Sequence, residues 1–150
     1  MTSLRLLAAG VLACVSNLVA AADGLVAVVS PYPVAETATR LEEAVKQRGL
    51  TVFLRLDHAA GAAKVGKALR PTELVVFGNP QGGTPFMECA QSVGIDLPLK
   101  ALVWQDAAGQ VWLGYNDPSW LGQRHGAPQC PSIEALRKAL AGIAGAVVAR

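Results

Sequence analysis

Two histidines, His58 and His125, are the side chains best suited to proton transfer or ligand binding near neutral pH. His58 directly follows Asp57, and His125 follows Asp117 within the same short segment. If the fold brings these positions together, the two imidazoles and an aspartate would bind a metal, a haem iron or a small acidic ligand, and His58 would act as a base. The alternative is structural, because a half-buried histidine commonly makes one hydrogen bond to the backbone.

The residues around the two histidines define a predicted ligand site. The region of residues 55–70 is basic, and the start of a short helix there would offer N–H groups to a small anionic ligand. No metal and no cofactor is predicted, because the histidines lie 67 residues apart and lack the spacing of a zinc site. The predicted ligand-binding residues are Arg55, Asp57, His58, Asn116, Asp117 and His125.

These residues favour a non-enzymatic binding or accessory module for a small ligand. The alternative is a small enzyme or a metal- or haem-binding protein that uses His58 and His125. An enzyme needs a concave pocket in which both histidines converge, whereas a binding module tolerates their separation. The sequence names no catalytic residue and does not decide between the two classes.

A glycine-rich stretch, GNPQGG at residues 78–83, also invites a chemical interpretation. Its spacing matches neither a P-loop nor a dinucleotide-binding fingerprint, and no Lys-Ser or Lys-Thr pair follows it. We therefore interpret it as a turn after a strand.

Residues 1–22 have the pattern of a secretory signal peptide. Arg5 supplies the positive charge, an apolar run follows, and three alanines precede the predicted cleavage point before Asp23. The mature protein would then be a single periplasmic domain of residues 23–150 without membrane attachment. The alternatives are retention of the run as a membrane anchor and lipidation of Cys14; the run is short of the roughly 20 apolar residues that a spanning helix needs.

The composition indicates a compact, nearly neutral globular domain. Apolar residues make up 52% of the chain and charged residues 16%, which excludes a disordered chain. Without Arg5 the balance is 12 basic against 11 acidic residues, or 12 − 11 = +1. Such a charge gives no long-range attraction to nucleic acid or anionic lipid, so neither is a predicted partner.

Cys89 and Cys130 are the two cysteines that remain after signal cleavage. In an oxidising compartment an even number of cysteines most often forms structural disulfides, so we expect one bridge between them. The competing interpretation is a reactive dithiol, although neither cysteine belongs to a C-x-x-C motif.

The elements that must position these side chains follow from hydrophobic periodicity. The strand at 51–58 is expected to place Val52, Leu54, Leu56 and His58 on one face and Arg55 and Asp57 on the other. Predicted strands occupy 25–30, 51–58 and 73–80 and the two arms of a hairpin within 100–117; predicted helices occupy 33–48 and the segment from 133 to 147; shorter helical segments are expected within 59–69 and 118–124.

The hairpin pairs two large aromatic side chains. A three-residue loop with Gly109 in the left-handed conformation would place Trp104 opposite Trp112. Because both faces of the hairpin carry apolar bulk, the tryptophans need a cover. A second subunit is the first expectation; a flat ligand and the chain's own 82–92 or 118–126 segments are the alternatives.

Several motifs resemble one bacterial family. The segments RLDHAAGA, LRPTELVVFGNPQGGTP, DLPLKALVW, GQVWLGYNDPSWL and RHG, in this order, are similar to the family known as domain of unknown function 302. The resemblance implies a single domain of the strand-helix-four strands-helix type that forms dimers, and it implies no activity. Together with the tight turns, it predicts an α+β fold with an antiparallel sheet, helices on one face and short helical insertions.

Overall fold

The computed structural model describes residues 22–150 of the protein. The predicted signal peptide lies outside the described residues except for Ala22, its last residue. No helix among those described combines the length and the hydropathy that crossing a membrane requires.

The five strands form one antiparallel sheet in the spatial order β1-β5-β4-β3-β2. This arrangement and the chain order of its main elements confirm the predicted α+β class. The strands are β1 (Leu25–Ser30), β2 (Thr51–Asp57), β3 (Thr72–Gly78), β4 (Leu99–Gln105) and β5 (Val111–Asn116).

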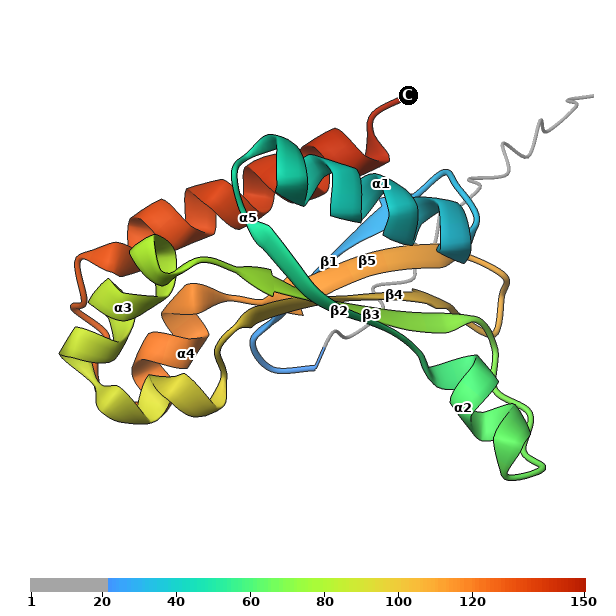
Figure 1. Cartoon of the computed structure of the whole chain (residues 1–150), viewed down its shortest axis with the longest axis horizontal. Coiled ribbons are helices and arrows are strands. Elements are labelled where there is room, and N and C mark those ends of the chain that lie inside the picture. Colours follow the sequence, from blue (N-terminus) through green and yellow to red (C-terminus); the bar gives the residue numbers. More distant parts are fainter. Residues whose placement is uncertain (1–21) are drawn as a thin grey trace, which may run out of the picture.

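The helices divide into a covering pair and a set of insertions. The covering pair, α1 (Val34–Gln47) and α5 (Ser132–Val148), lies side by side on one face of the sheet (Figure 1). The insertions lie at the two ends of the sheet, with α2 projecting at one end and α3 and α4 at the other (Figure 1). They are α2 (His58–Lys64), α3 (Pro80–Cys89), the 3-10 helix η1 (Gln91–Ile95) and α4 (Pro118–Arg124).

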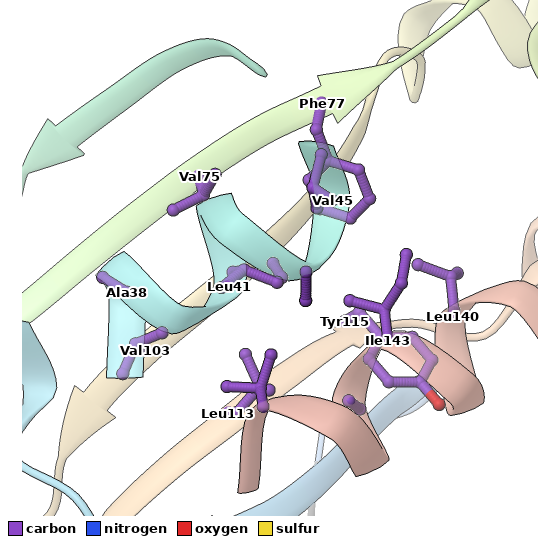
Figure 2. Close-up of a cluster of buried hydrophobic side chains, with 14 of the residues drawn as sticks. Ala38, Leu41, Val45, Val75, Phe77, Val103, Leu113, Tyr115, Leu140 and Ile143 are labelled. Carbon is purple, nitrogen blue, oxygen red and sulfur yellow. The ribbon is translucent and has the colours of Figure 1, made fainter. Parts of the chain in front are cut away.

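The main hydrophobic core lies between the covering pair and the front face of the sheet (Figure 2). Val75, Phe77 and Val103 point from the strands toward Leu41 of α1, and all four side chains are almost completely buried. The alternation of the strands places every second residue on this face, while helical periodicity aligns the apolar stripes of α1 and α5 above it.

A second, smaller core joins the insertions at one end of the sheet. Phe86 of α3, Val93 of η1 and Leu121 of α4 are fully or almost fully buried in it, together with Ile133 and Leu136 from the first turns of α5. Helix α5 therefore belongs to both cores, since its later residues Leu140 and Ile143 pack on the sheet.

The predicted alternation of β2 is wrong after Val52, because the pairing register with β3 shifts between Val52 and Leu54. A β-bulge of this kind inserts one extra residue, here Phe53, and exchanges the faces of everything that follows. Arg55 consequently points toward α1, while Leu54 and Leu56 lie on the opposite face and remain exposed by 48% and 41%.

The opposite face, called the rear face below, is apolar and is not covered by α1 or α5. It is defined by Val29, Leu54, Leu56, Trp104 and Trp112. The two indoles stack with ring centroids 6.4 Å apart. Trp104 pairs with the first residue of β3, so the indoles lie at the α2 end of the sheet. Segments 82–92 and 118–126 lie at the other end, with α3 and α4 (Figure 1), so the alternative that they cover the tryptophans is wrong.

The β4–β5 hairpin has the predicted register, with Trp104 opposite Trp112 and Gly109 at a φ of 84°. Asp106 organises the turn because its carboxylate accepts hydrogen bonds from the backbone N–H groups of Ala108 and Gln110 and from Trp112 Nε1. The bond from Trp112, with the two backbone bonds, lowers the pKa of Asp106 below its ordinary value.

We expect Asp106→Asn to destabilise the protein at neutral pH, because an amide nitrogen replaces one of the acceptor oxygens. A lowered folded-state pKa means that the carboxylate stabilises the fold above its unfolded-state pKa and that this contribution disappears as the pH falls through the folded-state pKa. Urea unfolding should therefore show a lower midpoint for the variant at neutral pH and a shrinking difference in acid. Glu43→Gln on exposed α1 surface is the control; a difference independent of pH would contradict the role of the charge.

Candidate functional site

A pocket of about 640 Å³ lies between α3, α5 and the carboxyl end of β3. Its floor includes Gly78, and the segment from Leu97 to Leu99 closes one side. Residues Leu136, Leu140 and Ile143 of α5 form the facing wall. The volume falls within the range of roughly 300–1,000 Å³ that is typical of small-molecule sites.

The wall of this pocket carries no charged side chain among the described residues. The polar side chains that reach it are Asn79, Gln81, Thr84 and Ser132, and the rest of the lining is apolar or glycine. The Asn79 side chain is already engaged, since its Oδ1 accepts from Gly82 N at 2.8 Å. The pocket therefore favours an uncharged molecule with a large apolar surface.

The predicted turn at GNPQGG is wrong, because residues 80–89 form the helix α3. Asn79 caps the helix and Pro80 occupies its first turn, where a missing N–H costs no hydrogen bond. Burial of Phe86 in the second core anchors the far half. Space favours glycine at position 82, since a Cβ there would stand 3.2 Å from Asn79 Oδ1, which is tighter than an ordinary van der Waals contact.

A disulfide between Cys89 and Cys130 connects the two walls of the pocket, as predicted. Cys89 ends α3, and Cys130 precedes the first turn of α5. Cys130 is buried in the second core, while Cys89 is exposed. The bridge thus restrains the distance between α3 and α5 independently of side-chain packing.

The structure does not bring the two histidines together. Strands β2 and β5 are separated by three antiparallel pairings in the sheet, so they run in opposite directions. Their carboxyl ends therefore lie at opposite ends of the sheet. His58 follows β2 into the projecting helix α2, whereas His125 ends α4 at the other end (Figure 1). His58 is exposed, and its neighbour Asp57 caps α2 by accepting from Ala60 N.

Arg55 connects β2 to α1. Its guanidinium donates to the Glu73 carboxylate at 2.6 Å, to Thr39 Oγ1 and to the carbonyl oxygen of Ala35, and it lies 3.5 Å from the Glu42 carboxylate. The hydrogen bond to Glu73 raises the pKa of Arg55 above its ordinary value. These contacts direct the Arg55 side chain toward α1 and β3, whereas His58 lies in α2.

Asp117 and Asn116 lie at the start of α4. The Asp117 carboxylate caps the helix by accepting from Ser119 N, and it lies 3.6 Å from the guanidinium of Arg137 on α5. Asn116 is the last residue of β5 and pairs with Leu25. Neither residue lines the pocket between α3 and α5.

His125 makes side-chain contacts with both a serine and an aspartate. Its Nε2 lies 2.6 Å from Asp96 Oδ2, and its Nδ1 lies 3.0 Å from Ser92 Oγ. Arg124 donates to the other oxygen of the Asp96 carboxylate at 3.1 Å. Both the histidine and the aspartate side chain are buried, with exposed fractions of 7% and 12%.

The family is decided by a match over most of the chain, since a family model described as "Domain of unknown function DUF302" covers residues 26–146. The chain belongs to the DUF302 family. A solved structure of an uncharacterized conserved DUF302 protein from Bacillus stearothermophilus has the same fold, with a TM-score of 0.76 at 25% identity. The similarity covers 84% of this chain and 99% of that structure.

Curated relatives of this DUF302 domain are longer proteins. A protein named fluoride-specific ion channel FluC 1 from Brucella suis biovar 1 (strain 1330) is 53% identical over 103 residues, 69% of this chain and 41% of the relative. One named FluC 2 from Brucella melitensis biotype 1 has the same identity over 38% of its length. The chain thus spans about two fifths of the curated relatives it matches.

The pocket could not be predicted from the sequence, because its lining combines segments that are distant in the chain. The available signal was the concentration of small residues on facing elements, namely Gly82 and Gly83 in α3 and Ala135 and Ala139 in α5. Small side chains on two elements that face each other leave unfilled space, but the facing itself depends on the tertiary fold.

We expect removal of the disulfide in a Cys89→Ser, Cys130→Ser double variant to loosen the pocket wall. A 41-residue loop corresponds to about 4 kcal/mol in the chain-entropy model, so the free energy of unfolding should fall by up to about that amount. Urea unfolding measures the loss, and alkylation without reductant followed by mass spectrometry should detect no free thiol in a wild-type protein of residues 23–150. Two labelled cysteines in that sample would contradict the bridge.

Proposed function

We propose that this DUF302 domain is an exported binding module that takes a small, uncharged, largely apolar molecule into the pocket between α3 and α5. The observation that carries the proposal is a site-sized cavity of about 640 Å³ whose lining, within residues 22–150, contains no Asp, Glu, Lys, Arg or His. Burial of an apolar ligand there would gain about 25 cal/mol per Å² of apolar surface removed from water.

The position of the pocket supports binding as its role. It lies where the two hydrophobic cores meet, and Leu140 and Ile143 line it while also packing against the sheet (Figure 2). The opposite wall is α3, which the disulfide links to the start of α5. The site is therefore built largely from rigid elements, which limits the entropy lost when a ligand binds.

The disulfide and the curated relatives support an exported accessory role. Disulfides persist mainly in oxidising compartments, which agrees with the predicted periplasmic location. In the Brucella proteins named fluoride-specific ion channels, a similar domain makes up about two fifths of the polypeptide. We therefore propose that the domain serves a larger membrane-associated assembly as a ligand-binding part rather than as the ion-conducting part.

The pocket can be tested with the uncharged dye N-phenyl-1-naphthylamine, whose fluorescence rises in an apolar environment. We expect the mature protein to bind it, and we expect Ala139→Phe to reduce the affinity at least tenfold, a loss of about 1.4 kcal/mol. Ala139 lines the pocket and is exposed, so the larger ring fills the cavity without entering the core.

Ala141→Phe is the matched control, because Ala141 is exposed on the same helix but does not line the pocket. It should bind the dye like the wild-type protein. Absence of dye binding to the wild type, or equal loss in both variants, would overturn the proposal.

The rear face supports a homodimer as the form in which the module acts. Val29, Leu54 and Leu56 are 47%, 48% and 41% exposed, and they lie on the same face of the sheet as the stacked pair Trp104 and Trp112. Lys100 is the one charged residue among the strand positions of this face in the described chain. A second copy placed across a two-fold axis would bury matching apolar surfaces without opposing like charges.

Sedimentation velocity tests the homodimer. We expect the mature wild-type protein to sediment as a dimer and Leu56→Glu to sediment as a monomer, because the new carboxylate would be buried at the interface. Ala141→Glu, on the helical side of the molecule, should remain dimeric. A monomeric wild-type protein at high concentration would exclude the second copy as the cover of the rear face.

A further inference from the structure

The cluster of Ser92, Asp96 and His125 has the hydrogen-bond order of a nucleophile, a base and an orienting carboxylate. Ser92 Oγ lies 3.0 Å from His125 Nδ1, and His125 Nε2 lies 2.6 Å from Asp96 Oδ2. Neither the proposed binding function nor the pocket uses these three residues.

The protonation pattern follows from the contacts. An ionised carboxylate can only accept a hydrogen bond, so Asp96 requires the proton of a neutral imidazole to be on Nε2. Nδ1 then carries the free lone pair and accepts from the Ser92 hydroxyl. This tautomer is the one in which the imidazole can remove the serine proton.

Burial separates the roles of the three side chains. His125 and Asp96 are 7% and 12% exposed, whereas Ser92 is exposed on η1. Arg124 fixes the second oxygen of the Asp96 carboxylate, and the buried residues Val93 and Leu121 hold η1 and α4 in the second core. The base is thus fixed within the protein while the nucleophile faces solvent.

We propose that Ser92 is an activated nucleophile that accepts acyl groups from small, uncharged, activated esters, with His125 as its general base and Asp96 as the positioning residue. Ser92 Oγ forms a bond to the ester carbonyl carbon as its proton passes to His125 Nδ1. The bond to the leaving alcohol breaks, and the alcohol oxygen takes that proton. Water then attacks the acyl-serine by the same route, which releases a carboxylic acid and restores the hydroxyl.

Covalent labelling with an uncharged fluorophosphonate tests the nucleophile directly. The Ser92 oxygen replaces fluoride at phosphorus, and fluoride leaves together with the serine proton as hydrogen fluoride. Mass spectrometry of the mature protein should locate one adduct on Ser92. Ser92→Ala should abolish it, and Ser119→Ala should not, because the Ser119 hydroxyl has no histidine partner in the structure.

The base is tested by the rate of labelling and by the hydrolysis of p-nitrophenyl acetate. His125→Gln should lower both rates about 10²-fold, which is the lower range for a positioned general base. Asp96→Asn should lower them less and should alter the pH profile. Circular dichroism and dye binding to the α3–α5 pocket show whether each variant remains folded.

The outcomes separate this proposal from the binding function. An unlabelled wild-type protein, an adduct on another residue, or equal rates in folded His125→Gln would overturn the proposal. Dye binding by Ser92→Ala should equal that of the wild type, since Ser92 does not line the pocket.

Discussion

Burial of the front face of the sheet beneath α1 and α5 is the constraint on which the rest of the structure depends. Full burial of side chains such as Phe77, Val103 and Leu41 contributes about 1.5–3 kcal/mol each relative to exposure. This burial fixes the angle at which α5 crosses the sheet. Because α5 is longer than the part that covers the strands, its first turns extend beyond the sheet and form the second core with α3, η1 and α4.

The pocket is a consequence of this extension. Leu136 belongs to the second core and Leu140 to the main core, and the space between the two cores is lined by both. Glycines in α3 and alanines in α5 leave that space unfilled, and the disulfide prevents its walls from separating. The same second core holds Ser92 and His125 near each other, so the binding pocket and the serine cluster share a structural cause although they share no residue.

The rear face follows from a local irregularity in an edge strand. The bulge at Phe53 turns Arg55 inward, where Glu73 and Glu42 neutralise it, and turns Leu54 and Leu56 outward onto the face that carries the tryptophans. One inserted residue therefore removes a charge from the rear face and adds two leucines to it. The apolar surface that we assign to a second copy depends on this exchange.

Much of the architecture could be predicted from sequence because it depends on local rules. Periodicity located α1 and α5, and turn chemistry set the pairing of Trp104 with Trp112. The cysteine pair was also predictable, since the two cysteines of residues 23–150 allow one intramolecular bridge. Apart from the cysteine pair, which follows from a count, each of these inferences needs information from only a few neighbouring positions.

The candidate site was much less predictable. The prediction grouped His58 with His125, and the antiparallel strand order places them at opposite ends of the sheet. Similarly, the turn predicted at GNPQGG became the helix α3, because burial of Phe86 outweighs the low helix propensity of its glycines and prolines.

The sequence by itself determined the fold class, the hairpin register and the disulfide, since these follow from periodicity, turn residues and composition. Only the tertiary structure decided that α3 faces α5 across a pocket, that β2 changes faces at Phe53, and that Ser92 and Asp96 meet His125. The physical reason is that long-range proximity depends on how two cores pack around one helix, and no local pattern of residues encodes that geometry.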